Sequence, residues 1–201
     1  MDGRIRSAEI LCVGTELLLG DIVNTNAAFL SQRLAELGIC VYRHTAVGDN
    51  PKRLRLALER ALEEADLVIT SGGLGPTYDD LTKETVAECF GREMELDTRS
   101  LERIEDYFKR TGRVMTENNR KQAMMPKGAV IFDNDYGTAP ALALRGAPGR
   151  ILSFCHGCSS ALLSFRRPAV SHSIVLGIPL SVNENWRNHR MFTHLCRPLP
   201  P

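Results

Sequence analysis

The sequence has no long apolar stretch. No run approaches the ~20 apolar residues that a membrane-spanning helix needs. The first residues, MDGRIRSAEILCV, also lack the apolar segment of an export signal. These absences predict a cytoplasmic protein in which the six cysteines stay reduced. Cys12, Cys40 and Cys89 lie within apolar patterns, and we interpret them as small core residues.

The chain also lacks a strong net charge. A formal charge of +1 gives no support for binding to nucleic acid or to an anionic membrane. The charge is unevenly spread, because residues 147–201 hold six arginines and one glutamate but neither lysine nor aspartate. The length of 201 residues suits one domain with a sizeable core.

Apolar runs and helical patterns alternate along the first two thirds of the chain. Short apolar runs predict strands at 8–13, 39–47 and 67–70. Apolar residues at helical spacing, with capping residues before them, predict helices over 23–37, 51–65, 79–90, 98–111 and 117–125. This alternation with short connections predicts an α/β sandwich around a mainly parallel sheet.

The segments after the three predicted strands are polar or rich in glycine. They read GTELLLG, VGDN and TSGGLGPTYDD. Ligands of parallel sheets bind beyond the carboxyl ends of the strands. We therefore expect a pocket mouth at this edge that gathers Glu16, Asp49, Asp79 and Asp80.

The third of these segments predicts a phosphate site. Gly72, Gly73 and Gly75 would let backbone N–H groups approach a ligand, and the following helix adds its positive end. The loop lacks the lysine of a Walker loop, and its acids would repel a bare phosphate. A divalent cation held by Asp80, Asp49, Glu16 and Asp79 would resolve that conflict and could activate water.

Each of these residues also has a purely structural interpretation. The glycines could be turn residues, and Asp79 or Thr77 could cap the next helix. Asp49 could cap the helix that begins at Pro51, and Glu16 could be a solvated acid. Spacing alone does not decide between a phosphate site and a structural turn.

Five motifs in one order carry a family resemblance. They are AEILCVGTELLLGDIVNTNAAFL (8–30), TAVGDN (45–50), SGGLGPTYDDLT (71–82), TENNRKQAMMP (116–126) and GTAP (137–140). Together they closely resemble the N-terminal domain of the bacterial competence/damage-inducible CinA proteins, which belongs to the wider molybdopterin-binding fold of MogA, MoaB and part of MoeA. The resemblance covers residues 7–146 and implies a three-layer α/β sandwich around a mixed sheet.

The resemblance also implies an activity. In CinA proteins this domain is associated with hydrolysis of the ADP-ribose diphosphate by a divalent metal (Mg, Mn or Co), whereas relatives bind or adenylylate molybdopterin. Relatives form dimers or trimers, so a homo-oligomer is expected. The competing hypothesis is a non-catalytic domain that binds a nucleotide or a molybdopterin-like ligand.

Site residues follow from the motifs by position. The resemblance implies phosphate or substrate binding by Gly72, Gly73, Gly75, Thr77, Asn118, Asn119, Gln122 and Thr138. It implies metal or catalytic roles for Asp80 and Asp49, with Arg120 as the partner for a phosphate. A capped and solvated helix is the structural alternative for residues 118–122.

The chain departs from the family after Arg150. We place a CinA-like domain at residues 1–150 and an atypical tail at 151–201, without the deamidase domain of longer CinA proteins. The family expects an aliphatic strand and a PGPP-like loop where this chain has ILSFCHGCSS. Three interpretations compete: a zinc site (Cys155, Cys158, His189, His194 and Cys196), a divergent extension, and a reading-frame slip near Ile151. The slip, which we favour, predicts a disordered or poorly packed tail and a domain that lacks one strand and one pocket wall.

Overall fold

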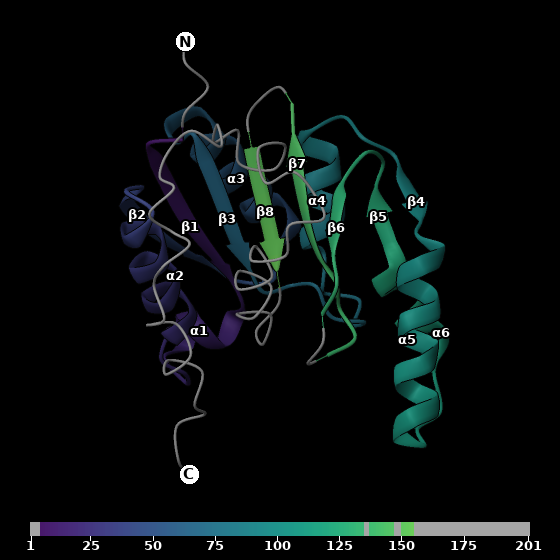
Figure 1. The fold of residues 1–201 in the computed structure, drawn as a ribbon. Helices are drawn as coiled ribbons and strands as arrows, with labels where there is room; N and C mark the ends of the chain where they lie inside the picture. The colour runs from purple at the N-terminus through teal and green to yellow at the C-terminus, as the bar shows by residue number, and fades with distance from the viewer. Residues whose placement is uncertain (1–4, 135–136, 147–149, 155–201) are drawn as a thin grey trace, which may run out of the picture.

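The fold is built on a six-stranded sheet with the strand order β2-β1-β3-β8-β7-β6 (Figure 1). A computed structural model describes residues 5–134, 137–146 and 150–154. The strands are β1 (Ser7–Val13), β2 (Cys40–Val47), β3 (Leu67–Ser71), β6 (Val130–Phe132), β7 (Ala141–Arg145) and β8 (Arg150–Phe154). The first four in spatial order are parallel, whereas β7 runs antiparallel to both β8 and β6.

Helices cover both faces of this sheet. On one face, α2 (Thr25–Glu36) buries Ala27, Leu30 and Leu34 against the strands. On the other face lie α3 (Pro51–Glu64) and α4 (Thr82–Cys89), whose apolar residues complete a second core cluster. The strands β1 and β3 are buried on both faces, as expected for parallel strands between two helical layers. The predicted three-layer α/β sandwich around a mixed sheet is therefore confirmed.

A smaller unit lies beyond the β6 edge of the sheet (Figure 1). It consists of the antiparallel pair β4 (Met94–Leu96) and β5 (Met124–Pro126), the helices α5 (Thr98–Thr111) and α6 (Glu117–Arg120), and the 3₁₀ turn η1 (Lys121–Ala123). Asp97 caps α5 by accepting a hydrogen bond from the Ser100 amide at 2.7 Å, and its own amide donates to the Ala123 carbonyl at 2.9 Å. The start of α5 is thus tied to the end of η1.

Three local predictions need correction. Asn50, not Asp49, caps α3, because the Asn50 side chain accepts from the Arg53 amide at 3.1 Å. Helix α4 begins at Thr82, three residues later than predicted, and neither Thr77 nor Asp79 caps it. The helix predicted over 117–125 stops at Arg120 and passes through η1 into β5, because Met124 and Met125 pair with β4.

The strand that a frame slip near Ile151 would remove is present. Residues 150–154 form β8, which pairs in parallel with β3 and antiparallel with β7. The predicted loss of this strand is wrong, and the sheet is continuous from β2 to β6. The zinc-site, extension and disorder hypotheses for the rest of the tail lie outside the described residues.

The cysteines of the described segments only partly follow the prediction. Cys12 is buried in β1, and Cys89 is partly buried, so that burial raises the pKa of both thiols. Cys40 is exposed, which corrects its interpretation as a core residue. Within the described ranges, none of the helices has the length and apolar character needed to traverse a bilayer.

Candidate functional site

The carboxyl ends of β1 and β3 lie side by side at one edge of the sheet, and a hollow of about 210 Å³ opens there. It is lined by Cys12, Val13, Glu16, Leu17, Ile22, Val23, Asn24, Asn26, Ser71 and Gly72. Helix α1 (Thr15–Leu19) and the segment after it form one wall. Asn26 donates a hydrogen bond to the Ser71 hydroxyl at 2.9 Å and so joins α2 to the end of β3.

The glycine loop (Gly72–Asp80) follows β3 and packs tightly against its surroundings. Gly72 has a φ of 104°, and a Cβ atom at this position would overlap the Val13 carbonyl oxygen. A Cβ at Gly73 would meet the Thr82 hydroxyl, and one at Gly75 would meet the Asp80 carboxylate. The glycines are therefore required by close contacts within the protein itself, as the turn interpretation expects.

The same loop leaves a series of backbone N–H groups unpaired. Among the described residues, the amides of Gly73, Leu74 and Gly75 donate no hydrogen bond, and neither do those of Tyr78 and Leu81. Successive free N–H groups in a turn form a concave surface that attracts anions. The turn and phosphate-site interpretations are thus compatible: protein contacts fix the shape of the loop, and the amides remain free for a ligand.

The two acids at the end of the loop have different surroundings. Asp80 accepts hydrogen bonds through Oδ2 from both the amide of Thr77, at 2.9 Å, and the Thr77 hydroxyl. Asp79 is exposed, and the Thr77 hydroxyl, together with the Asp79 amide, holds the pKa of the Asp79 carboxyl below its usual value. The Thr77 amide is therefore committed to Asp80 and does not face a ligand.

Asp49 repeats this arrangement at the end of β2. Its Oδ2 accepts hydrogen bonds from the amide of Thr15 at 2.9 Å and from the Thr15 hydroxyl at 2.7 Å. This contact ties the β2 end to the start of α1 and leaves Oδ1 outside the described hydrogen bonds. The adjacent Glu16 folds back over Gly14, where a Cβ would overlap its carboxylate, and lines the small hollow.

The predicted shell of four acids is not assembled as a preformed metal cage. Within the described segments, no three or more His, Cys, Asp or Glu side chains lie close enough together to hold a metal ion. Magnesium commonly takes only one or two protein carboxylates and completes its shell with phosphate oxygens and water. The free Oδ1 atoms of Asp49 and Asp80 have the donor chemistry for that smaller role.

Two lysines join the glycine loop to the segment over α6 and η1. The Lys121 ammonium donates to the carbonyl oxygens of Thr77, at 3.2 Å, and Asp80, at 2.7 Å. The Lys83 ammonium donates to the carbonyl oxygens of Lys121, at 3.0 Å, and Gln122, at 2.9 Å. The structure thus brings together two motifs that lie about 40 residues apart in the sequence.

The residues predicted to bind substrate from 118–122 take different positions. Asn119 is buried, and its Oδ1 accepts from the amide and the hydroxyl of Thr116, as the capped-helix alternative expects. Gln122 is buried, and Oε1 has no partner among the described atoms. Asn118 and Arg120 are exposed, and the Arg120 guanidinium makes no described ion pair or hydrogen bond, so it is available to an anion.

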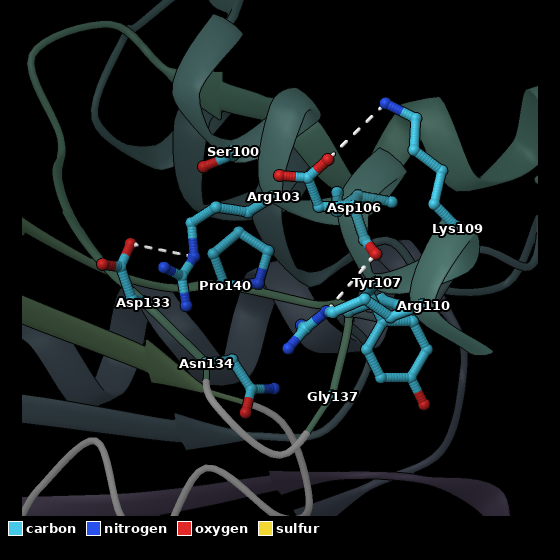
Figure 2. A pocket seen from close by; sticks show the side chains of 12 residues that line it. Ser100, Arg103, Asp106, Tyr107, Lys109, Arg110, Asp133, Asn134, Gly137 and Pro140 are labelled. Atoms are coloured by element: carbon cyan, nitrogen blue, oxygen red, sulfur yellow. Dashed lines mark hydrogen bonds and ion pairs between the residues drawn. The ribbon is translucent and has the colours of Figure 1, made fainter.

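A larger hollow of about 670 Å³ lies between α5 and a wall formed by Asp133, Asn134, Gly137, Thr138 and Pro140 (Figure 2). Thr138 lines this hollow and not the one beside Glu16 and Gly72. Figure 2 shows that its charges partly neutralise each other: Arg103 pairs with Asp133 at 3.5 Å, and Lys109 with Asp106 at 3.5 Å. The larger size of this hollow alone does not make it a better candidate for the ligand site than the glycine loop with its free amides.

Sequence reasoning missed Lys83 and Lys121. Lys83 is only 2% exposed, and burial lowers its pKa to about 8. One signal for it was present, because Lys83 precedes Val86 and Phe90 by three and seven residues and so shares the core-facing side of α4. Lys121 gave no such signal, because its position depends on the turn into η1.

The six-stranded mixed sheet between two helical layers defines the protein as a three-layer α/β domain. A family model described as a probable molybdopterin binding domain matches residues 9–167. The crystal structure of CinA from Thermoplasma acidophilum is similar with a TM-score of 0.70 and 34% identity, and the match covers 80% of this chain and 94% of that one. The chain belongs to the CinA family within the molybdopterin-binding domains.

Other relatives agree with this assignment. The competence-damage inducible proteins of Bacillus cereus (strain ATCC 10987) and Bacillus mycoides (strain KBAB4) are 61% and 59% identical over 138 residues, which is 69% of this chain. The matched part is 34% of each relative, so the chain spans about a third of their length. MoaB from Thermus thermophilus shares the fold alone, at 19% identity and a TM-score of 0.53, over 87% of this chain and 99% of that one.

Proposed function

We propose that the glycine loop binds the phosphate groups of a nucleotide diphosphate and that the domain hydrolyses this diphosphate, with ADP-ribose as the first substrate to test. The observation that supports the proposal is the set of free amides at Gly73, Leu74 and Gly75, held in a loop of fixed shape. Arg120 is exposed on the segment over α6 and η1, which Lys83 and Lys121 join to this loop. Its guanidinium group neutralises part of the negative charge of the phosphates.

The carboxylates give the site its chemistry. Thr77 fixes the orientation of Asp80 and Thr15 fixes that of Asp49, so each carboxylate presents Oδ1 without the cost of ordering a mobile side chain. Through these oxygens the acids accept hydrogen bonds from a water molecule and orient it towards phosphorus. A divalent cation bound by Asp80 and Asp49 would promote ionisation of water and offset the phosphate charge.

Turnover of ADP-ribose to AMP tests this proposal. The protein is incubated with ADP-ribose and Mg²⁺, Mn²⁺ or Co²⁺, and AMP is measured together with the binding of ADP-ribose by calorimetry. Asp80→Asn keeps the shape of the side chain but removes its charge, and we expect AMP formation to fall about 100-fold. Glu102→Gln, on the exposed side of α5, is the matched control and should leave turnover unchanged. Absence of both binding and turnover in the unaltered protein would overturn the proposal.

A second candidate is a binding domain without catalysis. It is supported by the family model, whose description names molybdopterin binding. A phosphate monoester would suit the same free amides as a diphosphate does. Binding of ADP-ribose and of a simple monoester such as AMP with similar affinity, without any turnover, would favour this candidate. We expect the reaction or binding to take place in the cytoplasm, in a dimer or trimer.

A further inference from the structure

We infer that Lys83 and Lys121 are positioning residues of the phosphate site, and that together they replace the lysine that the glycine loop itself lacks. We call them, with the four carbonyl oxygens that they bind, the lysine bridge. The inference rests on the proposed phosphate binding for its functional meaning, but the geometry of the bridge is independent of any ligand.

The first step is the action of Lys121 on the loop. A peptide unit is planar and trans, so its C=O and its N–H point in opposite directions. Lys121 draws the carbonyl oxygens of Thr77 and Asp80 towards its ammonium group. The amides of the same two peptide units, at Tyr78 and Leu81, are therefore turned away from Lys121, and both lack a hydrogen-bond partner in the described part of the chain.

The second step is the support of Lys121 by Lys83. The Lys83 ammonium binds the carbonyl oxygens of Lys121 and Gln122, which fixes the backbone from which the Lys121 side chain extends. Lys83 belongs to α4, the helix that directly follows the glycine loop. The two contacts are therefore reciprocal: Lys83 of α4 fixes the backbone of η1, and Lys121 of η1 fixes the loop that precedes α4.

The third step is electrostatic. Lys121 has one carboxylate partner, Glu84 at 3.6 Å, whereas Lys83 binds only neutral carbonyl groups in the described contacts. The bridge thus adds more positive than negative charge behind the loop. A buried charge acts through a low local dielectric, so it favours an anion at the loop even without touching it.

The test compares three lysine variants by nuclear magnetic resonance and calorimetry. Lys121→Met should lower the backbone order parameters of Gly73, Gly75 and Tyr78 from about 0.85 towards 0.6 and weaken ADP-ribose binding about tenfold. Lys121→Arg keeps donors for the two carbonyl groups and should restore both values, since this side chain is only partly buried. Lys127→Met, at an exposed turn, is the matched control and should change neither.

The outcomes separate this inference from the proposed function. If order parameters fall in Lys121→Met but the unaltered protein binds no ADP-ribose, the lysine bridge stands and the proposed function fails. If ADP-ribose binds and Lys121→Met remains folded with unchanged order parameters and affinity, the inference is wrong. Lys83→Met gives an additional measurement where it folds, and should loosen the amides of 118–122 as well as those of the loop.

Discussion

At the scale of single residues, Lys83 is the least expected feature of the chain. Its ammonium group is almost completely removed from water, yet it lies next to carbonyl groups that accept its hydrogen bonds. Burial has the largest effect on its pKa and lowers it, the neighbouring Lys121 lowers it further, and Glu84 and Asp80 oppose the change. The result is a pKa of about 8 in place of the ordinary 10.5.

This lowered pKa predicts a pH dependence of stability. The folded protein binds the Lys83 proton less tightly than the unfolded chain does, so the protonated form disfavours folding. The free-energy cost of burying the protonated Lys83 amine applies in full below pH 8, and it disappears as the pH rises from 8 to 10.5. At about 1.4 kcal/mol per pKa unit, the free energy of unfolding should rise by roughly 2–3 kcal/mol over this range relative to Lys83→Met. Urea unfolding of both proteins at several pH values measures the difference, and parallel curves would contradict the lowered pKa.

At the scale of elements, the glycine loop and the C-terminus of α4 show two different uses of glycine. Gly75 leaves room for the Asp80 carboxylate, whereas Gly91 ends α4 with a φ of 59° and has no neighbour where a Cβ would lie. A methyl group at Gly75 would overlap the Asp80 carboxylate, whereas a methyl group at Gly91 would meet no neighbour and would cost only the strain of the left-handed conformation.

Substitution of these two glycines by alanine should therefore separate activity from stability. Gly75→Ala should displace Asp80 from Thr77 and reduce ADP-ribose binding or turnover at least about tenfold, with little change in thermal stability. Gly91→Ala should destabilise the protein by about 1–2 kcal/mol and leave the site intact. Calorimetry and thermal unfolding of both variants provide the comparison. A reversed pattern would show that Gly75 serves the fold and not the site.

The elements also show what sequence reasoning can reach. The predicted strands and the helices α2, α3 and α5 were confirmed because their apolar residues repeat at a clear period and their capping residues, such as Asn24, act locally. The missed elements are short: α1 and β7 have five residues each, and β4, β5 and β6 have three each. Segments of that length form only through partners distant in the sequence, so they leave no periodic pattern to read.

At the scale of the whole molecule, β8 joins two parts of the sheet. It lies between the parallel strands β2, β1 and β3 on one side and the antiparallel strands β7 and β6 on the other. Leu152 is the central residue of this strand, and its backbone is paired with that of Ile69 in β3 and that of Ala143 in β7. A strand in this position cannot be removed without separating the sheet into two parts.

Proline at position 152 tests the role of this strand. Proline has no N–H for the ladder and is excluded from central strands. We expect Leu152→Pro to destabilise the protein by about 3 kcal/mol or more, a large share of the ~5–15 kcal/mol of a typical domain. Val114→Pro is the control, because Val114 is 86% exposed and its amide donates no described hydrogen bond. Urea midpoints of the two variants measure the effect, and equal midpoints would show that β8 is dispensable.

The candidate site was less predictable than the fold. Motif positions predicted roles for the glycine loop, Asp49, Asp80 and Arg120, but they could not show that Thr77 and Thr15 already occupy one oxygen of each acid. Nor could they decide between ligand binding by Asn119 and the capping hydrogen bond that its side chain accepts from Thr116. Such hydrogen bonds depend on the side-chain directions of the folded chain, which a one-dimensional pattern does not contain.

The two lysines also have a consequence for the order of folding. Their hydrogen bonds join residues 38 to 44 positions apart, so each of these bonds closes a long stretch of chain that contains β4, α5 and α6. Contacts of such long sequence separation are slow to form. A folding chain in which β1, β2 and β3 have already paired would therefore still lack an ordered glycine loop. The ability to bind a phosphate ligand should appear only when α6 and η1 dock against that loop.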